Sequence, residues 1–84
     1  MNERVIRNLI AATCELPDDP TTLSSDADLY TAGLTSFASV QLMLALEQAF
    51  DIEFPDRLLN RKTFASIRNI NDAIALIRAE QDAA

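Results

Sequence analysis

The sequence predicts an all-α fold, a small helical bundle of three longer helices and one short helix. Three stretches repeat apolar residues at the spacing of one helix face, and no useful length of chain alternates apolar and polar residues as a strand does. The chain has 84 residues, of which 49% are hydrophobic, enough for one small core. We therefore expect a single domain over residues 1–84, with a frayed tail at 79–84 that has little to bury.

The first helix is expected over residues 3–14, with Asn2 available as its N-cap. Pro17 ends it, because proline disfavours a helical conformation in the residue before it. The apolar side of this helix comprises Val5, Ile6, Leu9, Ile10 and Thr13.

A connection of about twenty residues follows, rich in the Asp, Ser, Pro and Gly residues that favour turns. A loop of this length in a compact domain tends to be functional or to contain a short helical turn. We expect Leu29 and Leu34 to anchor it to the core.

The second helix begins behind Thr35, whose hydroxyl is suited to accept a hydrogen bond from a free amide of the first turn. Gly33 supplies the backbone freedom needed to enter that turn. Ser36 then falls in the first turn, where free N–H groups and the helix dipole favour an anion. A phosphate esterified to Ser36 would lie in a favourable field, although a serine here often serves only to start a helix.

Residues 37–50 carry two apolar stripes. The first has the spacing of a core-facing stripe and comprises Leu42, Met43, Leu46, Ala49 and Phe50. The second contains Phe37, Val40 and Leu44, with Gln41, Glu47 and Gln48 beside it. Because a small domain has a high ratio of surface to volume, we favour a docking surface over complete burial of this helix.

After this helix, Pro55 suits the first turn of a brief helix through residues 56–59. Thr63 or Ser66 is expected to cap the last helix. The core stripe of the last helix comprises Ile67, Ile70, Ala73, Ile74 and Ile77.

Several features bear on the compartment. No run of about 18 apolar residues exists, and charged residues interrupt the N-terminal stretch, so we expect neither a membrane span nor a signal peptide. Cys14 is the single cysteine, which excludes an internal disulfide and fits a reducing compartment. We expect a cytoplasmic protein in which Cys14 acts as a small apolar residue.

The net charge of −6 is unevenly distributed. Between Asn8 and Asp56 there are nine acidic residues and no Lys or Arg, whereas residues 57–84 are net basic. The acidic surface makes nucleic acid a poor candidate partner, because its backbone would be repelled. A basic patch on a partner protein would instead be steered towards it.

The composition also limits the chemistry. The absence of His excludes a Ser–His or Cys–His nucleophile pair and removes the commonest transition-metal ligand. The acids near Asp18 and Asp26 lack the spacing of a calcium loop, so no metal site is expected. One glycine cannot form a Gly-rich phosphate cradle. We expect no catalytic residues and no enzyme activity in this chain.

Over nearly its whole length, the sequence resembles the acyl carrier protein family, including the peptidyl and aminoacyl carrier domains. The resemblance rests on Gly33-Leu34-Thr35-Ser36-Phe37, on the helix at 40–50 and on the segment 51–55. It implies that Ser36 carries a 4′-phosphopantetheine arm, donated by coenzyme A, whose thiol holds an acyl group as a thioester. The family typically has Asp before this serine and Leu after it, whereas this chain has Thr35 and Phe37.

The resemblance also implies partners: a phosphopantetheinyl transferase, an acyl-loading enzyme and a downstream acceptor. The front of the helix at 37–50 is nearly uncharged, whereas the corresponding helix of fatty-acid carriers is rich in acids. This difference favours a stand-alone aminoacyl carrier served by an amino acid:[carrier protein] ligase. We expect a monomer that docks through a surface made of Thr35, Phe37, Val40, Gln41 and Leu44, with Arg57, Arg61 and Lys62 as a contributing basic cluster.

Two alternatives stay open on the residues. The first is a fatty-acyl or polyketide carrier with the same arm on Ser36. The second is a helical interaction module, in which the same apolar surface binds a partner helix and Ser36 only starts a helix.

Overall fold

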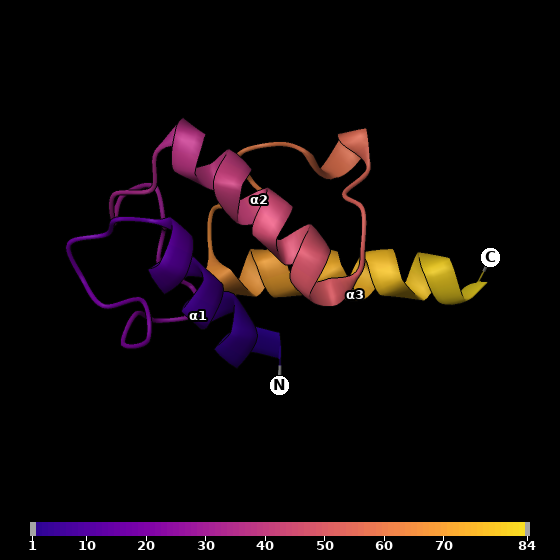
Figure 1. The fold of residues 1–84 in the computed structure, drawn as a ribbon, viewed down its shortest axis with the longest axis horizontal. Coiled ribbons are helices and arrows are strands. Elements are labelled where there is room, and N and C mark those ends of the chain that lie inside the picture. Colours follow the sequence, from indigo (N-terminus) through magenta and orange to yellow (C-terminus); the bar gives the residue numbers. More distant parts are fainter. Residues whose placement is uncertain (1, 84) are drawn as a thin grey trace.

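The computed structural model describes residues 2–83, and within them the chain forms three α-helices and one short 3₁₀ helix. The helices are α1 (Asn2–Thr13), α2 (Ser36–Phe50), η1 (Asp56–Leu58) and α3 (Ile67–Ala83). No strand occurs in this part of the chain, which confirms the predicted all-α bundle. Figure 1 shows α2 crossing over α3, with α1 beside both and η1 in the connection that leads from α2 to α3.

One core holds these elements together, with α1 packed against both α2 and α3. Ile6 and Ile10 face inward from α1, and Leu42, Leu46 and Phe50 do so from α2. All five predicted residues of the α3 stripe are buried as well. Burial of apolar area is the main favourable contribution to folding, so these stripes determine which face of each helix points inward.

Two residues assigned to the core-facing stripes are exposed. Val5 on α1 is 40% exposed, and Ala49 on α2 is exposed although Leu46 and Phe50 beside it are buried. Each lies at the margin of its stripe, and helical spacing defines a stripe's centre better than its edges. Asn2 was expected to precede α1 but is its first helical residue.

The long connection between α1 and α2 is bound to α1 and to the segment just before α3. Leu29 and Leu34 are buried, as predicted, and the Leu29 N–H donates to the Ala65 carbonyl at 2.7 Å. From α1, Arg7 Nη1 donates to the Pro20 carbonyl at 2.8 Å and to the Leu23 carbonyl at 2.5 Å. These bonds satisfy backbone carbonyls that would otherwise lack partners in an irregular segment.

Gly33, just before α2, has a φ of +121°, a conformation that L side chains rarely adopt. A Cβ at this position would lie 3.1 Å from Cδ of Pro17. The backbone angle therefore requires glycine, and the contact with Pro17, in the connection after α1, leaves little room for a side chain.

The last connection shows which of the two predicted caps is used and corrects the extent of the short helix. Ser66 caps α3, since its Oγ accepts from the Asn69 N–H at 3.1 Å, whereas Thr63 is buried and donates both its N–H and its hydroxyl to Asn60. The short helix behind Pro55 is present but is a 3₁₀ helix that ends one residue before Leu59. The α3 helix extends to Ala83, through most of the tail expected to fray; residues 79–82 are exposed, and fraying there stays a prediction.

Candidate functional site

The start of α2 has the cap that the sequence predicts. Thr35 is in an extended conformation, and its Oγ1 accepts a hydrogen bond from the Ala38 N–H at 3.1 Å. Ser36 is consequently the first helical residue, and it is exposed. Because the cap at Thr35 ends the loop, α2 starts at Ser36, and this first helical residue lies at the surface.

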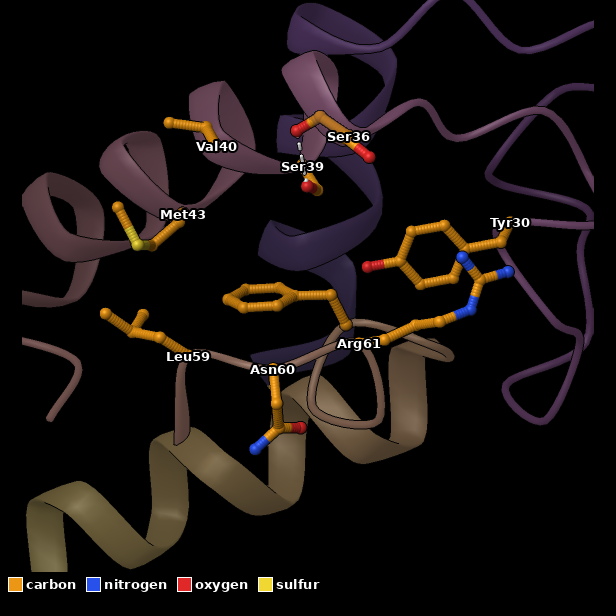
Figure 2. A pocket seen from close by; sticks show the side chains of 9 residues that line it. Tyr30, Ser36, Ser39, Val40, Met43, Leu59, Asn60 and Arg61 are labelled. Carbon is orange, nitrogen blue, oxygen red and sulfur yellow. Dashed lines mark hydrogen bonds between the residues drawn. The ribbon is translucent and has the colours of Figure 1, made fainter. Parts of the chain in front are cut away.

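The Ser36 hydroxyl makes no hydrogen bond within residues 2–83, whereas the neighbouring Ser39 hydroxyl does. Ser39 Oγ donates to the Ser36 carbonyl at 2.7 Å, the contact drawn as a dashed line in Figure 2. A hydroxyl that already donates to its own helix is less available for reaction than one that faces solvent. Of the two serines in this turn, the structure leaves Ser36 accessible.

The backbone N–H groups of Ser36 and Phe37 have no acceptor among the described residues. They belong to the first turn of α2, where the helix dipole also favours negative charge. The two residues are exposed, so a phosphate attached to Ser36 could approach these amides. The local geometry therefore fits a phosphate ester on Ser36.

A cavity of about 400 Å³ opens beside Ser36, between α2 and the segment 59–64. Figure 2 shows Val40 and Met43 on one side, Leu59 and Asn60 on the opposite side, and Ser36 at the same end as Tyr30 and Arg61. The complete lining consists of Tyr30, Ser36, Ser39, Val40, Met43, Leu59, Asn60, Arg61 and Phe64. The cavity combines apolar walls with a polar end at Ser36, as ligand-binding clefts usually do.

The structure separates the three cations that were predicted to form a cluster. The Arg61 guanidinium carbon lies 3.9 Å from the centroid of the Tyr30 ring, at the Ser36 cavity. Arg57 forms an ion pair with Glu80 near the end of α3, and Lys62 lines a separate depression with Leu76. Sequence proximity did not imply a shared location, because the turns after η1 direct these side chains to different surfaces.

The second stripe of α2 is exposed. The exposed fractions are 74% for Phe37, 52% for Val40 and 51% for Leu44. Phe37 and Leu44 are seven residues apart, about two helical turns, so they point the same way. This exposed apolar surface is the kind that marks a docking site.

The remaining predicted docking residues lie on either side of Phe37. Thr35 and Gln41 are exposed and line a second cavity with Phe37 on the α1 side of α2. Val40 lines the Ser36 cavity on the other side. Thus Thr35, Phe37, Val40, Gln41 and Leu44 form one surface around the start of α2, which we call the α2 surface, whereas Arg57 lies elsewhere.

Asp28 holds the turn that carries Tyr30. Its Oδ1 accepts from the Tyr30 N–H at 2.9 Å and from the Thr31 N–H at 3.3 Å. The Thr31 amide is the main cause that lowers the pKa of the Asp28 carboxyl below its ordinary value, with the Tyr30 amide and the Arg61 charge as weaker causes. The sequence analysis did not predict that Tyr30 lines the cavity.

Cys14 lies apart from this site. It is buried in the core, and burial raises the pKa of its thiol, so the reactive thiolate is disfavoured. The described residues contain no group of acids and Cys that could hold a metal ion. None of the helices within residues 2–83 is both long and apolar enough to cross a membrane.

The comparison with protein families decides among the carrier and non-carrier alternatives. Residues 4–77 match the family described as "Phosphopantetheine attachment site". The chain belongs to this phosphopantetheine attachment family. Membership identifies phosphopantetheine as the cofactor and makes a plain helical interaction module untenable.

A similar protein of this family is the aminoacyl carrier protein of Agrobacterium fabrum (strain C58). It is 58% identical over 79 residues, which cover 94% of this chain and 95% of the relative. The resemblance to carrier proteins stated from the residues is therefore confirmed at the level of the family and of a close relative.

Solved structures agree with this assignment. One is the crystal structure of engineered Bradyrhizobium japonicum glycine:[carrier protein] ligase complexed with carrier protein from Agrobacterium tumefaciens and ATP. A chain of that structure is 57% identical to this one, and the match covers 92% of this chain and 100% of that chain, with a TM-score of 0.88. A chain in the structure of the B. japonicum ligase complexed with glycylated carrier protein is 29% identical over 84% of this chain and 95% of that chain, with a TM-score of 0.71. The helical arrangement described above is thus that of known carrier proteins.

Proposed function

We propose that this member of the phosphopantetheine attachment family is an aminoacyl carrier, in which Ser36 bears 4′-phosphopantetheine as a phosphodiester. The observation that carries the assignment is the exposed Ser36 hydroxyl, free of hydrogen bonds within residues 2–83, at the start of a helix capped by Thr35. A phosphopantetheinyl transferase supplies the arm from coenzyme A. The terminal thiol of the arm then holds the cargo as a thioester.

The cargo is aminoacyl because similar proteins include an aminoacyl carrier protein, 58% identical, and a carrier found with a glycine:[carrier protein] ligase, 57% identical. The loading partner is an amino acid:[carrier protein] ligase, and glycine is the first amino acid to test. We assign the docking of this ligase to the α2 surface, whose centre is Phe37.

The chain contributes no catalytic step in this scheme. It has no His, and its one cysteine is buried, so it lacks a nucleophile with a base beside it. The chain positions the arm at its surface, and the ligase activates the amino acid. A cytoplasmic location and a monomeric state stay predictions.

The modification is tested by incubating the apo protein with coenzyme A and a broad-specificity transferase, then measuring its intact mass. The parent and Ser39→Ala should gain the mass of one arm, and Ser36→Ala should gain none while keeping the parent's helicity. Ser39→Ala is the matched control, because it lies in the same turn and leaves Ser36 in place. Modification of Ser36→Ala would show that another residue carries the arm.

The cargo is tested by charging the holo protein with glycine or another amino acid, ATP and a ligase. A thioester adduct is expected on the holo protein and none on the apo protein. Loading of the apo protein would contradict the non-catalytic role. Acceptance of fatty-acyl groups in preference to every amino acid would assign the chain to the fatty-acyl alternative.

A further inference from the structure

The cavity beside Ser36 has a single charged residue among those that line it, Arg61. The other lining residues are apolar or uncharged, and none is acidic. Arg61 belongs to the net basic segment 57–84, whereas the residues between Asn8 and Asp56, which include Ser36, contain no Lys or Arg. Arg61 is therefore the one cation among the residues that line the cavity with Ser36, where it could meet a negatively charged group on that serine.

Arg61 is held in place by a ring and not by an acid. Its guanidinium carbon lies 3.9 Å from the centroid of Tyr30, close enough for a cation–π interaction. Within residues 2–83 no carboxylate lies within 4.0 Å of it, whereas Arg57 pairs with Glu80 and Arg68 pairs with Asp26 at 3.1 Å. The stacked guanidinium keeps its five N–H donors available at the edge of its plane.

We propose that Arg61 binds the phosphodiester of the arm on Ser36, with Tyr30 orienting the guanidinium. The inference rests on the proposed function, since it requires the arm to be attached there. A guanidinium pairs with two phosphate oxygens at once and is the side chain best suited to that geometry. Esterification of Ser36 places the negative charge at the end of the cavity where Arg61 and Tyr30 lie (Figure 2).

The consequence is that Arg61 acts on the arm of its own chain. It is a positioning residue: by holding the phosphate, it directs the first part of the arm along the cavity and away from open solvent. This role differs from the partner contact expected for Arg61 from the sequence.

The experiment compares apo and holo protein by nuclear magnetic resonance, with no ligase or transferase present in the final samples. Intact mass first shows that Ser36 is fully modified. The Arg61 Nε–H resonance should then shift on modification, and the Nε–H resonances of Arg57 and Arg68 should stay in place. Arg57 and Arg68 are controls within the same molecule, because they are exposed and already paired.

Phosphorus resonance gives a second readout, with the holo protein unfolded in urea as the reference for an unbound phosphodiester. In holo Arg61→Gln, the phosphorus shift should move towards that reference, because loss of an exposed ion pair lowers the equilibrium constant for phosphate binding by about two- to fivefold. Arg61→Lys should give an intermediate value, because it keeps the charge but not the planar fork. Arg57→Gln should match the parent.

The outcomes separate this inference from the proposed function. If Ser36 gains no arm, the proposed function fails and the inference fails with it. If Ser36 is fully modified but the Arg61 resonance does not move more than those of Arg57 and Arg68, the inference is wrong and the carrier function stands. An Arg61 shift that arises only after a ligase is added would likewise overturn it, in favour of the partner contact.

Discussion

Glu47 Oε2 accepts a hydrogen bond from the backbone N–H of Phe54 at 2.8 Å. The bond joins the segment after α2 to the last part of that helix. The Phe54 ring in turn packs on Phe64, with their centroids 5.5 Å apart, and Phe64 lines the Ser36 cavity. Glu47 was expected beside the docking stripe, but in the structure it supports one wall of the cavity.

The first prediction follows from this bond. Glu47→Ala should lower the free energy of unfolding by about 1 kcal/mol, because it leaves the Phe54 N–H without its acceptor. The melting temperature should fall by about 4–8 °C for a domain of this size. Glu53→Ala is the control, since Glu53 is exposed and makes no side-chain hydrogen bond within residues 2–83. Equal melting temperatures for the two variants would show that the Glu47 bond contributes nothing.

A second prediction concerns the docking of the ligase. Phe37→Ala should weaken binding about tenfold, which corresponds to about 1.4 kcal/mol, because an exposed aromatic residue that becomes buried is a typical anchor. The melting temperature should hardly change, since the ring is 74% exposed. Titration calorimetry and a melting curve measure the two effects. Leu76→Ala, an exposed apolar residue on α3, serves as the control and should bind like the parent.

The affinity and the melting curve test different parts of that prediction. Unchanged affinity in Phe37→Ala would remove Phe37 from the interface. A large fall in melting temperature would show instead that the ring packs in the core, where truncation costs several kcal/mol.

A third prediction tests the helix cap. Thr35→Ala should destabilise the protein by about 1 kcal/mol, because the Ala38 N–H loses the Thr35 Oγ1 acceptor. Thr35→Asp should keep the cap and restore most of this stability, since an Asp side chain accepts the same bond and adds a favourable charge at the helix start. Thermal melting of the three proteins decides the matter. A Thr35→Ala variant as stable as the parent would mean that the bond is not maintained in solution.

The fourth prediction concerns pH. The folded state lowers the pKa of Asp28, chiefly through the Thr31 amide, so the ionised carboxylate favours the folded state. That contribution is fully present above the ordinary Asp pKa of about 4, and it is lost as the pH falls through the lower pKa of the folded state. Asp28→Asn keeps an acceptor oxygen but cannot ionise. It should melt below the parent at pH 7, and the gap should close as the pH falls below about 4.

A gap that stays constant down to pH 2 would contradict this account, because the difference could not then arise from ionisation. Asp18→Asn is a suitable comparison, since Asp18 is exposed and makes no hydrogen bond within residues 2–83. Its melting temperature should follow that of the parent throughout the titration.

The helices and the exposed position of Ser36 could be predicted from the sequence because they depend on neighbours in the chain. Apolar spacing identified the helices, and Gly33, Thr35 and Ser36 indicated where α2 begins. The caps were less certain: Thr63 and Ser66 were equally suitable locally, and only the packing of Thr63 against Asn60 excluded it as a cap.

The sequence by itself determined that this chain would be helical and would expose Ser36 at a helix start, since helical periodicity and capping act within about two turns. Only the tertiary structure decided what lies beside Ser36. Tyr30 and Arg61 come together because the long loop and the segment after η1 both pack against the same end of α2. Contacts between residues so far apart depend on the folding of the whole core, and no local pattern records them.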